Sequence, residues 1–243
     1  MPTSAKCFTV VRGKRLRITR LDECGNPPAA EAESSLVVTK GFVSVGMSSE
    51  VAEGDDIEQK NADGDLCVSD KSRDQFKRWD LEIEFCEVDP SLLELVSNVV
   101  IEEDYDGTAV GVRGFQGANV DSFALELWTG VPGEDCQPGE PTTYGYLLLP
   151  FVVPGVLGDV EIENGATTFS VSGHTRGAGG WGVGPYEVIG TDAEHTPGPL
   201  SVPMQSREHH LMRTTVIAPP EVDCGAQDMP DYAWNLDDGE VPE

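Results

Sequence analysis

The sequence predicts a mainly β protein, built as an antiparallel β-sandwich or partial barrel with one short packed α-helix. Its 243 residues include 27 glycines and 17 prolines, which is typical of many short strands joined by tight turns. Between Trp79 and Val88, apolar and acidic residues alternate, so one face of that strand is apolar and the other acidic. Within Asp159–Ser172, the pair Asn164-Gly165 supplies the two positive-φ residues of a tight hairpin turn.

Strands are expected along most of the chain. They are predicted over Lys14–Leu21, Leu36–Ser48, Trp79–Val88, Ala109–Phe115, Ser122–Trp128, Tyr144–Val153 and Asp159–Ser172, with a last strand within Met204–Ala218. The run Tyr144–Val153 is almost entirely apolar, so it should lie at the centre of the sheet. In the predicted hairpin, Val160 lies opposite Phe169 and Ile162 lies opposite Thr167.

A single helix is predicted over residues 89–98. Asp89 is a good N-cap and Pro90 fits the first turn. The apolar residues that then fall on one helical face are Leu92, Leu95, Val96 and Val99. We therefore expect a helix of about three turns that lies across the apolar side of the sheet.

The domain organisation is predicted to be simple. We expect one β domain over residues 1–218 and an extended acidic C-terminal arm over residues 219–243 that holds Tyr232 and Trp234. Within the domain, residues 49–76 are polar and rich in acids, which predicts a long acidic loop. A loop of this length inside a compact domain is usually functional or mobile.

The charge of the chain is strongly negative and unevenly distributed. A formal net charge of −27 argues against binding to nucleic acid, which needs a basic surface, and it also favours solubility. Residues 1–20 carry six basic residues and no acid, whereas residues 221–243 carry eight acids and no base. Such ends could pair within one subunit or between neighbours, or they could be two solvated tails.

The cysteines do not form a metal-binding pattern. All six lack CxxC or short Cys/His spacing, so a zinc site is unsupported and no metal or cofactor is expected. No apolar stretch follows the N-terminal charge, so we expect no secretory signal and cysteines that remain free thiols in a reducing compartment. The longest apolar run, Tyr146–Leu157, contains two prolines and is far too short to cross a membrane.

Two motifs allow both a ligand-binding interpretation and a simpler structural one. Gly177–Gly182 matches GxGxxG, but Gly184-Pro185 follows, so no helix can begin there to hold a dinucleotide and a flexible loop is favoured. Gln59–Asp70 resembles a calcium loop, but Gln59 stands where the first acid belongs and Asp70 replaces the bidentate Glu. A polar hairpin tip is therefore favoured, with weak calcium binding left open.

No enzymatic signal stands out. The adjacent histidines His209 and His210 would point to opposite sides of a strand, so they cannot form a metal site by themselves. No serine or cysteine occurs in a nucleophile-elbow sequence, and the carboxylates are too numerous for one catalytic pair to be selected. We therefore expect a protein that is not an enzyme.

At RWDLEIEFCEVDPSLLELVSN, residues 78–98, the sequence resembles the major tail proteins of long, non-contractile-tailed phages, particularly those infecting actinobacteria. A long strand, a long polar loop, an amphipathic strand and a short helix follow in the same order as in that family, and the resemblance covers about residues 6–218. It implies a β-sandwich that forms hexameric rings, whose inner strands close a β-barrel. The rings stack into a tail tube, through which DNA passes without specific binding.

The resemblance also implies partners and locations for individual residues. The partners are copies of the chain itself and the tail tip or initiator, tape-measure and tail terminator proteins, in a virion tail assembled in the host cytoplasm. The residues expected to face the lumen are Ser44, Gly46, Ser48, Asp80, Glu82 and Glu84, with Val43, Val45, Leu81, Ile83 and Phe85 facing the core. The acids of the expected inter-ring loop are Glu50, Glu53, Asp55, Asp56, Glu58, Asp63 and Asp65. The expected inter-subunit residues are Arg12, Arg15, Arg17, Tyr232 and Trp234.

A second function class remains open on the sequence. The chain could be a soluble carbohydrate- or protein-binding β module, such as a capsid decoration or receptor-binding domain. Its binding platform would use Trp181, Tyr186, Tyr232 and Trp234. These aromatic residues fall in loops and in the C-terminal arm, whereas a sugar platform usually presents aromatic residues on one strand face.

Overall fold

The structure is a computed structural model that describes most of the chain. The described residues are 10–29, 31–87, 89–114, 116–117, 121–131, 142–161, 167–178, 180–184 and 188–230. The expected Asn164-Gly165 turn, the Ile162–Thr167 pair, Tyr186, Tyr232 and Trp234 lie outside them.

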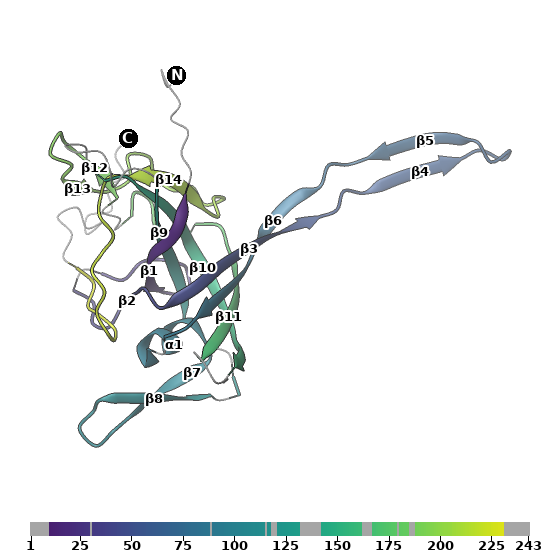
Figure 1. Ribbon diagram of the computed structural model, residues 1–243. Coiled ribbons are helices and arrows are strands. Elements are labelled where there is room, and N and C mark those ends of the chain that lie inside the picture. The colour runs from purple at the N-terminus through teal and green to yellow at the C-terminus, as the bar shows by residue number, and fades with distance from the viewer. Residues whose placement is uncertain are drawn as a thin grey trace.

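Within the described residues, one antiparallel sheet of eight strands forms the body of the molecule, as Figure 1 shows. The strand order is β2-β1-β9-β10-β11-β6-β3, and β14 also pairs with β10. The strands are β1 (Val11–Leu21), β2 (Leu36–Thr39), β3 (Phe42–Ala52), β6 (Gln75–Phe85), β9 (Ser122–Gly130), β10 (Tyr144–Glu161), β11 (Thr168–Thr175) and β14 (Leu211–Thr215).

Three further ribbons have two strands each among the described residues. They pair β4 (Asp56–Lys60) with β5 (Leu66–Lys71), β7 (Val99–Glu103) with β8 (Ala109–Gly114), and β12 (Ile189–Gly190) with β13 (Pro197–Gly198). The mainly β, antiparallel character predicted from the sequence is therefore confirmed. The described sheet does not close into a barrel within one chain.

Strand β10 is central, as its apolar sequence predicts. Its first part pairs with β9 on one side and β14 on the other, while its second part pairs with β11. The predicted register is confirmed where it is described, because Val160 lies opposite Phe169. The strand is longer than Tyr144–Val153, because it runs through Pro154 and two register shifts to Glu161.

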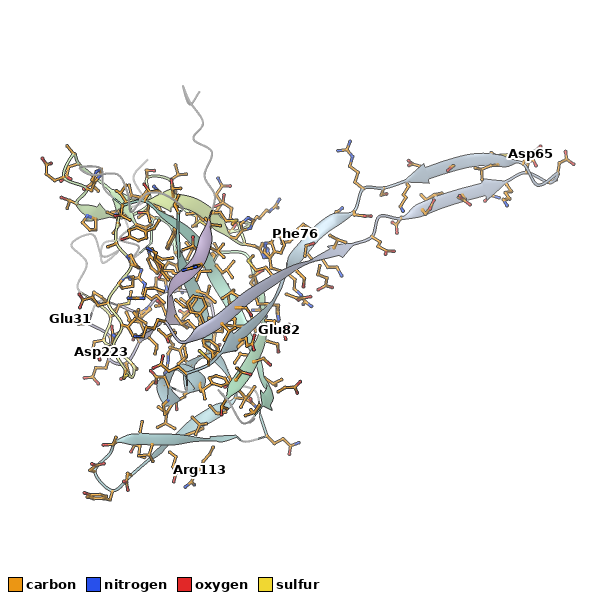
Figure 2. All side chains as sticks on the ribbon, in the orientation of Figure 1. Glu31, Asp65, Phe76, Glu82, Arg113 and Asp223 are labelled. Atoms are coloured by element: carbon orange, nitrogen blue, oxygen red, sulfur yellow. The ribbon has the colours of Figure 1, made fainter. Side chains whose placement is uncertain are left out.

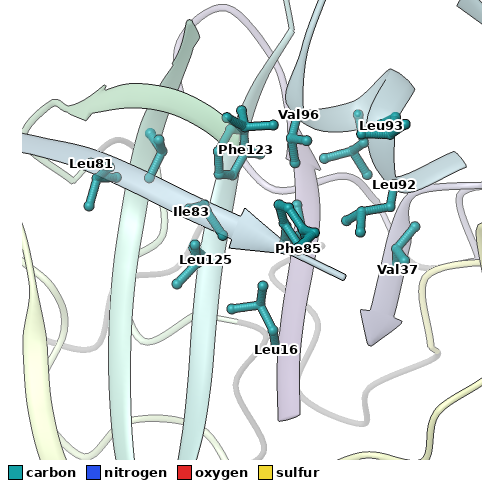
Figure 3. Close-up of a cluster of buried hydrophobic side chains, with 14 of the residues drawn as sticks. Leu16, Val37, Leu81, Ile83, Phe85, Leu92, Leu93, Val96, Phe123 and Leu125 are labelled. Carbon is teal, nitrogen blue, oxygen red and sulfur yellow. The ribbon is translucent and has the colours of Figure 1, made fainter. Parts of the chain in front are cut away.

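The main core lies where the sheet folds over onto itself. In Figure 3, β6 crosses above the strands that carry Leu16 and Leu125, and its side chains Ile83 and Phe85 point toward them. Burial of each large apolar side chain contributes about 1.5–3 kcal/mol to stability. The Phe42 ring of β3 also lies against β1, where it fills the space that a Cβ at Gly13 would need.

A second core covers the opposite face of β9 and β10. Trp128 and Tyr146 pack there against residues of the irregular segment 176–204, including Trp181, which is 1% exposed. The sequence predicts one buried face for Ser122–Trp128, but both faces are buried. This strand lies between two layers, which the alternation of its apolar residues does not reveal.

A helix is present where it was predicted, as α1 (Pro90–Val96) capped by Asp89, but it has only seven residues instead of about three turns, and Val99 belongs to β7. The Asp89 side chain accepts hydrogen bonds from the backbone N–H groups of Ser91 at 2.9 Å and Leu92 at 3.4 Å. The side chains that α1 buries in the main core are Leu92, Leu93, Leu95 and Val96. The helix therefore covers the apolar side of the sheet, as expected.

Three local predictions are corrected by the structure. Leu36–Ser48 is not one strand, because β2 ends at Thr39 and β3 begins at Phe42. Val43 does not face the core, since a bulge between Phe42 and Ser44 turns it outward and leaves it 52% exposed. Residues 49–76 are not a loop, because they contain the last residues of β3, the whole β4–β5 ribbon and the first residues of β6.

Candidate functional site

One side of β3, β6 and β11 forms a continuous polar surface, which we call the acidic face. Its rows across β3 and β6 are Ser44 with Glu84, Gly46 with Glu82, and Ser48 with Asp80. On β11, Ser170, Ser172 and His174 extend these rows. The structure thus brings together all six residues expected to face a lumen, while their role in a lumen stays a prediction.

A shallow hollow of about 360 Å³ lies on the acidic face. Its lining includes Glu82 and Glu84 from β6 and Asp159 from β10. From the sequence, Asp159 was expected on the polar face of the hairpin Asp159–Ser172, but it was not among the residues expected to face the lumen. Among the described residues, Glu82 and Glu84 form no ion pair, and no His/Cys/Asp/Glu group is arranged to hold a metal ion.

Charged pairs mark the end of the acidic face where β3 and β6 leave the body. Glu50 pairs with Arg78 at 2.7 Å and with Lys77 at 3.2 Å, and Arg78 also pairs with Asp80 at 3.0 Å. These groups are partly exposed, so each pair contributes about 0–1 kcal/mol. Glu50, expected in an inter-ring loop, therefore lies on a strand with partners in its own chain.

Beyond these pairs, residues 53–74 form a projection that we call the long hairpin. It extends from the body in Figures 1 and 2, with Asp65 at its tip and Phe76 near its root. Every residue of β4 and β5 is exposed, including Ile57, Leu66 and Val68. The predicted acids on it are Glu53, Asp55, Asp56, Glu58, Asp63 and Asp65. An isolated two-stranded hairpin is at best marginally stable in water.

The tip of the long hairpin is a tight polar turn. The Asn61 side-chain oxygen accepts hydrogen bonds from the backbone N–H groups of Asp63 at 3.0 Å and Asp65 at 2.8 Å. Gly64 adopts φ +90°, a conformation that favours glycine. The polar hairpin tip favoured over a calcium loop is what the structure contains at this point.

Aromatic and histidine side chains gather at the root of the long hairpin. The Trp79 indole N–H donates to Nδ1 of His210 at 3.2 Å, and the Phe76 ring meets the His209 ring edge-on at 5.1 Å. The Trp79 backbone N–H donates to Oγ1 of Thr175, which also lies 2.9 Å from Nδ1 of His209. Because an indole only donates, Nδ1 of His210 is the acceptor in this hydrogen bond.

The histidines around this root are held toward their neutral forms. Burial and the neighbouring His210 lower the pKa of His209. On the acidic face, burial lowers the pKa of His174, and the cations Arg78 and Arg176 lower it further. His209 and His210 were not expected to form a metal site, and their packing against Phe76 and Trp79 was not predicted, because it depends on a contact between segments distant in the chain.

The edge of the sheet at β2 is covered by the chain itself. Gln227 forms an antiparallel bridge with Leu36, and its backbone N–H donates to the Leu36 carbonyl at 2.7 Å. Met229, which is 3% exposed, packs with Leu36 and Val38. Within the arm expected over residues 219–243, residues 219–230 are described, and this part of the chain packs against the body.

Two other strand edges are open among the described residues. Strand β3 pairs only with β6, and β10 has no partner beside β11 after β9 leaves it at Val152. The acidic face thus belongs to a four-stranded part of the sheet: β3, β6, β11 and residues 154–161 of β10. Both outer strands present backbone groups that can pair with another strand, although on β10 the Leu157 N–H already donates to the Asn98 side chain at 3.3 Å and Pro154 has no N–H.

The basic residues near the N-terminus are divided between surface and interior. Arg17 is 7% exposed and donates to Glu126 at 2.5 and 2.7 Å, while the Tyr146 hydroxyl donates to the same carboxylate at 2.6 Å. This placement corrects the expectation that Arg17 reaches a neighbouring subunit. Arg12 is exposed and Arg15 is half-buried, so these two remain candidates for such contacts.

The described residues give little support to a dinucleotide-binding or a membrane-spanning protein. The GxGxxG match surrounds a turn that carries the buried Trp181, and no described helix follows it. Among the described residues, no helix combines the length and hydropathy needed to cross a bilayer. No protein-family model matches the chain, and no curated protein matches it significantly.

Proposed function

We propose that this chain is a structural subunit that assembles with copies of itself into rings, and that these rings stack into a tube of the phage-tail type. One observation supports this most directly: a four-stranded sheet whose outward face is acidic and whose two outer strands are open. The protein acts through assembly and performs no reaction.

Ring closure would join the two open edges. The edge of β3 (Phe42–Ala52) in one copy would pair with residues 154–161 of β10 in the next copy. Such a head-to-tail contact closes into a ring and removes the exposed edges that would otherwise promote aggregation. Strand β3 is 11 residues long and contains neither lysine nor proline, two residues that commonly prevent edge pairing, and its bulges lie near its two ends, after Phe42 and after Glu50. The number of six copies comes from the family resemblance.

In such a ring, the acidic faces would line the lumen. Glu82, Glu84 and Asp159 share one hollow, and no described cation neutralises the first two. A wall of like charges repels the phosphates of DNA, so DNA would pass without adhering. The tail tip or initiator, tape-measure and terminator proteins of the resembling family would be its partners in a virion tail.

For the alternative, a carbohydrate- or protein-binding module, one of the four aromatic residues of the expected binding platform is buried. Trp181 is buried in the second core, so its ring is not available to a sugar or a protein. No described aromatic surface replaces it on one strand face. We therefore retain assembly as the proposed function.

Negative-stain electron microscopy beside size-exclusion chromatography tests the proposal, on untagged protein with and without a tail-tip initiator complex. We expect rings or hollow tubes whose pore admits duplex DNA. Monomers that remain inert even with the initiator would contradict the proposal.

Charge reversal on the acidic face tests the lumen. Glu82→Lys with Glu84→Lys should still give tubes, because neither side chain is in the core, but DNA delivery by virions should slow or stop. The matched control, Glu23→Lys with Glu33→Lys, makes the same charge change at exposed sites off the acidic face. Normal infection by virions carrying the Glu82/Glu84 change would refute the lumen assignment.

A further inference from the structure

A second hairpin projects from the body, formed by β7 and β8 and called here the short hairpin (residues 99–114). In Figure 1 it leaves the end of the body opposite the start of β1, and Figure 2 places Arg113 on it. It exposes Val100 by 46%, Val110 by 58% and Tyr105 by 94%. Exposed β-branched and aromatic side chains on a two-stranded ribbon indicate that another surface completes it.

The tip of the short hairpin is negative, and backbone hydrogen bonds close its turn. The Asp104 N–H donates to the Thr108 carbonyl at 2.9 Å, and the Gly107 N–H donates to the Asp104 carbonyl at 2.9 Å. A hydrogen bond from the Thr108 N–H lowers the pKa of Asp106. Glu102 pairs with Arg113, but among the described residues no cation pairs with Glu103, Asp104 or Asp106.

The first residues of β1 form a basic end at the other side of the body. In the pairing with β9, Val11, Gly13 and Arg15 lie opposite Gly130, Thr129 and Trp128, so Arg12 and Lys14 are each an extra residue of a β-bulge. Bulges re-aim side chains and are common at functional sites. Arg12 also has φ +47°, a strained conformation for a residue other than glycine.

These basic side chains lack acidic partners among the described residues. The Nζ atom of Lys14 lies 5.0 Å from the centre of the Tyr144 ring, and Arg15 Nη1 donates to the Lys14 carbonyl at 2.7 Å. The Arg15 Nε atom is buried and has no hydrogen-bond partner. An anionic group that approaches this end would meet up to three positive charges.

We propose that the acidic tip of the short hairpin docks on the basic end of β1 in a second copy of this chain. The two surfaces have opposite charge and lie at opposite ends of the body, so they cannot meet within one copy (Figure 1). A contact between unlike ends repeats along an axis and therefore forms a stack. The inference rests on the proposed function and names the surfaces that join one ring to the next.

Charge reversal with compensation tests this contact. Arg12→Glu with Lys14→Glu should leave rings intact and raise the protein concentration needed for stacking by at least about tenfold, as expected for loss of a charged contact. Glu103→Lys with Asp106→Lys should have the same effect from the other side. The quadruple variant, with all four changes, should restore stacking. The measurement is ring and tube length by electron microscopy over a concentration series.

The controls separate the possible failures. Lys40→Glu with Arg207→Glu makes an equal charge change at exposed sites and should leave stacking unchanged. Circular dichroism of each variant checks folding, and the tip changes test the contact even if the β1 changes disturb the strand. Wild-type protein that forms no rings even with the tail-tip initiator complex would overturn both the proposed function and the docking. Reversed variants that stack like the wild type would overturn the docking alone.

Discussion

Strands β3 and β6 leave the body and continue toward the long hairpin, and the two halves of this ribbon differ in burial. In the body, Leu81, Ile83 and Phe85 are at most 4% exposed, and polar residues alternate with them. In the long hairpin, Ile57 and Val68 are about half exposed and neither face is covered. One chain therefore completes the first half, whereas the second half presents apolar side chains for which this chain provides no cover.

Removal of the long hairpin should have the largest effect. Residues 53–74 can be replaced by Asn-Gly, which closes the Ala52–Gln75 pair with a two-residue turn. We expect the monomer to keep its free energy of unfolding within about 1 kcal/mol, because the deleted strands touch no core. Assembly into tubes should be lost, if the long hairpin bridges to the next ring.

Urea unfolding and electron microscopy of this deletion variant separate the two expectations. A large loss of stability would mean that the long hairpin supports the body. Tubes of normal length would show that it does not bridge rings. A variant in which only the tip residues 61–65 are replaced by a short turn provides a control for changes in the turn itself.

A core truncation should have the next largest effect. Phe85 is fully buried and stacks on Phe169, with ring centroids 5.4 Å apart. Phe85→Ala should cost about 3–5 kcal/mol, since it removes apolar contacts and leaves a cavity. Ile57→Ala in the long hairpin should change the free energy of unfolding of the monomer by about 0.5 kcal/mol or less. Equal losses in urea unfolding would contradict the division between body and hairpin.

A smaller effect is expected at the helix cap. Asp89 caps α1 with one carboxylate oxygen, and its other oxygen accepts from the Gly225 N–H at 2.9 Å. Asp89→Ala should cost about 1–2 kcal/mol in the free energy of unfolding. Asp89→Asn keeps an acceptor for the helix, so it should cost less. An alanine variant as stable as the wild type would show that neither bond contributes.

Sequence patterns predicted the features that depend on near neighbours along the chain. The cap at Asp89, the pair Val160–Phe169 and the alternation of β6 follow from local spacing, and all were confirmed. The polar tip at 59–70 was predicted, but the strands on either side of it were not, because the segment is mostly polar and its large apolar residues, Ile57, Leu66 and Val68, are too few to show an alternation in both strands. The bulge at Val43 was missed because a bulge changes side-chain direction without a clear sequence signal.

Features built from distant segments could not be predicted at all. The acidic face gains Asp159 from β10, and the hairpin root gains His209 and His210 from the segment before β14. The β2 edge is covered by Gln227 and Met229, almost two hundred residues away. Each contact depends on the strand order, which periodicity along one segment does not determine.

The smallest expected effect is a local pH dependence at the root of the long hairpin. The folded structure lowers the pKa of His209, so the packed root binds fewer protons than an opened root. Its stability is therefore fully present above the ordinary histidine pKa of about 6.5, and it is lost as pH falls through that value and then through the lowered one.

Hydrogen exchange at the root measures this effect against a matched part of the same sheet. Amides of Phe76–Trp79 should lose protection on acidification relative to those of β9, after correction for the intrinsic pH dependence of exchange. His209→Gln removes the ring whose pKa is lowered and should weaken the pH response, whereas His210→Ala removes the acceptor of the Trp79 indole and should weaken the root at every pH. His174→Gln tests the histidine on the acidic face, whose pKa is also lowered. If the root and β9 respond equally in the wild type, His209 and His210 do not control the junction between the body and the long hairpin.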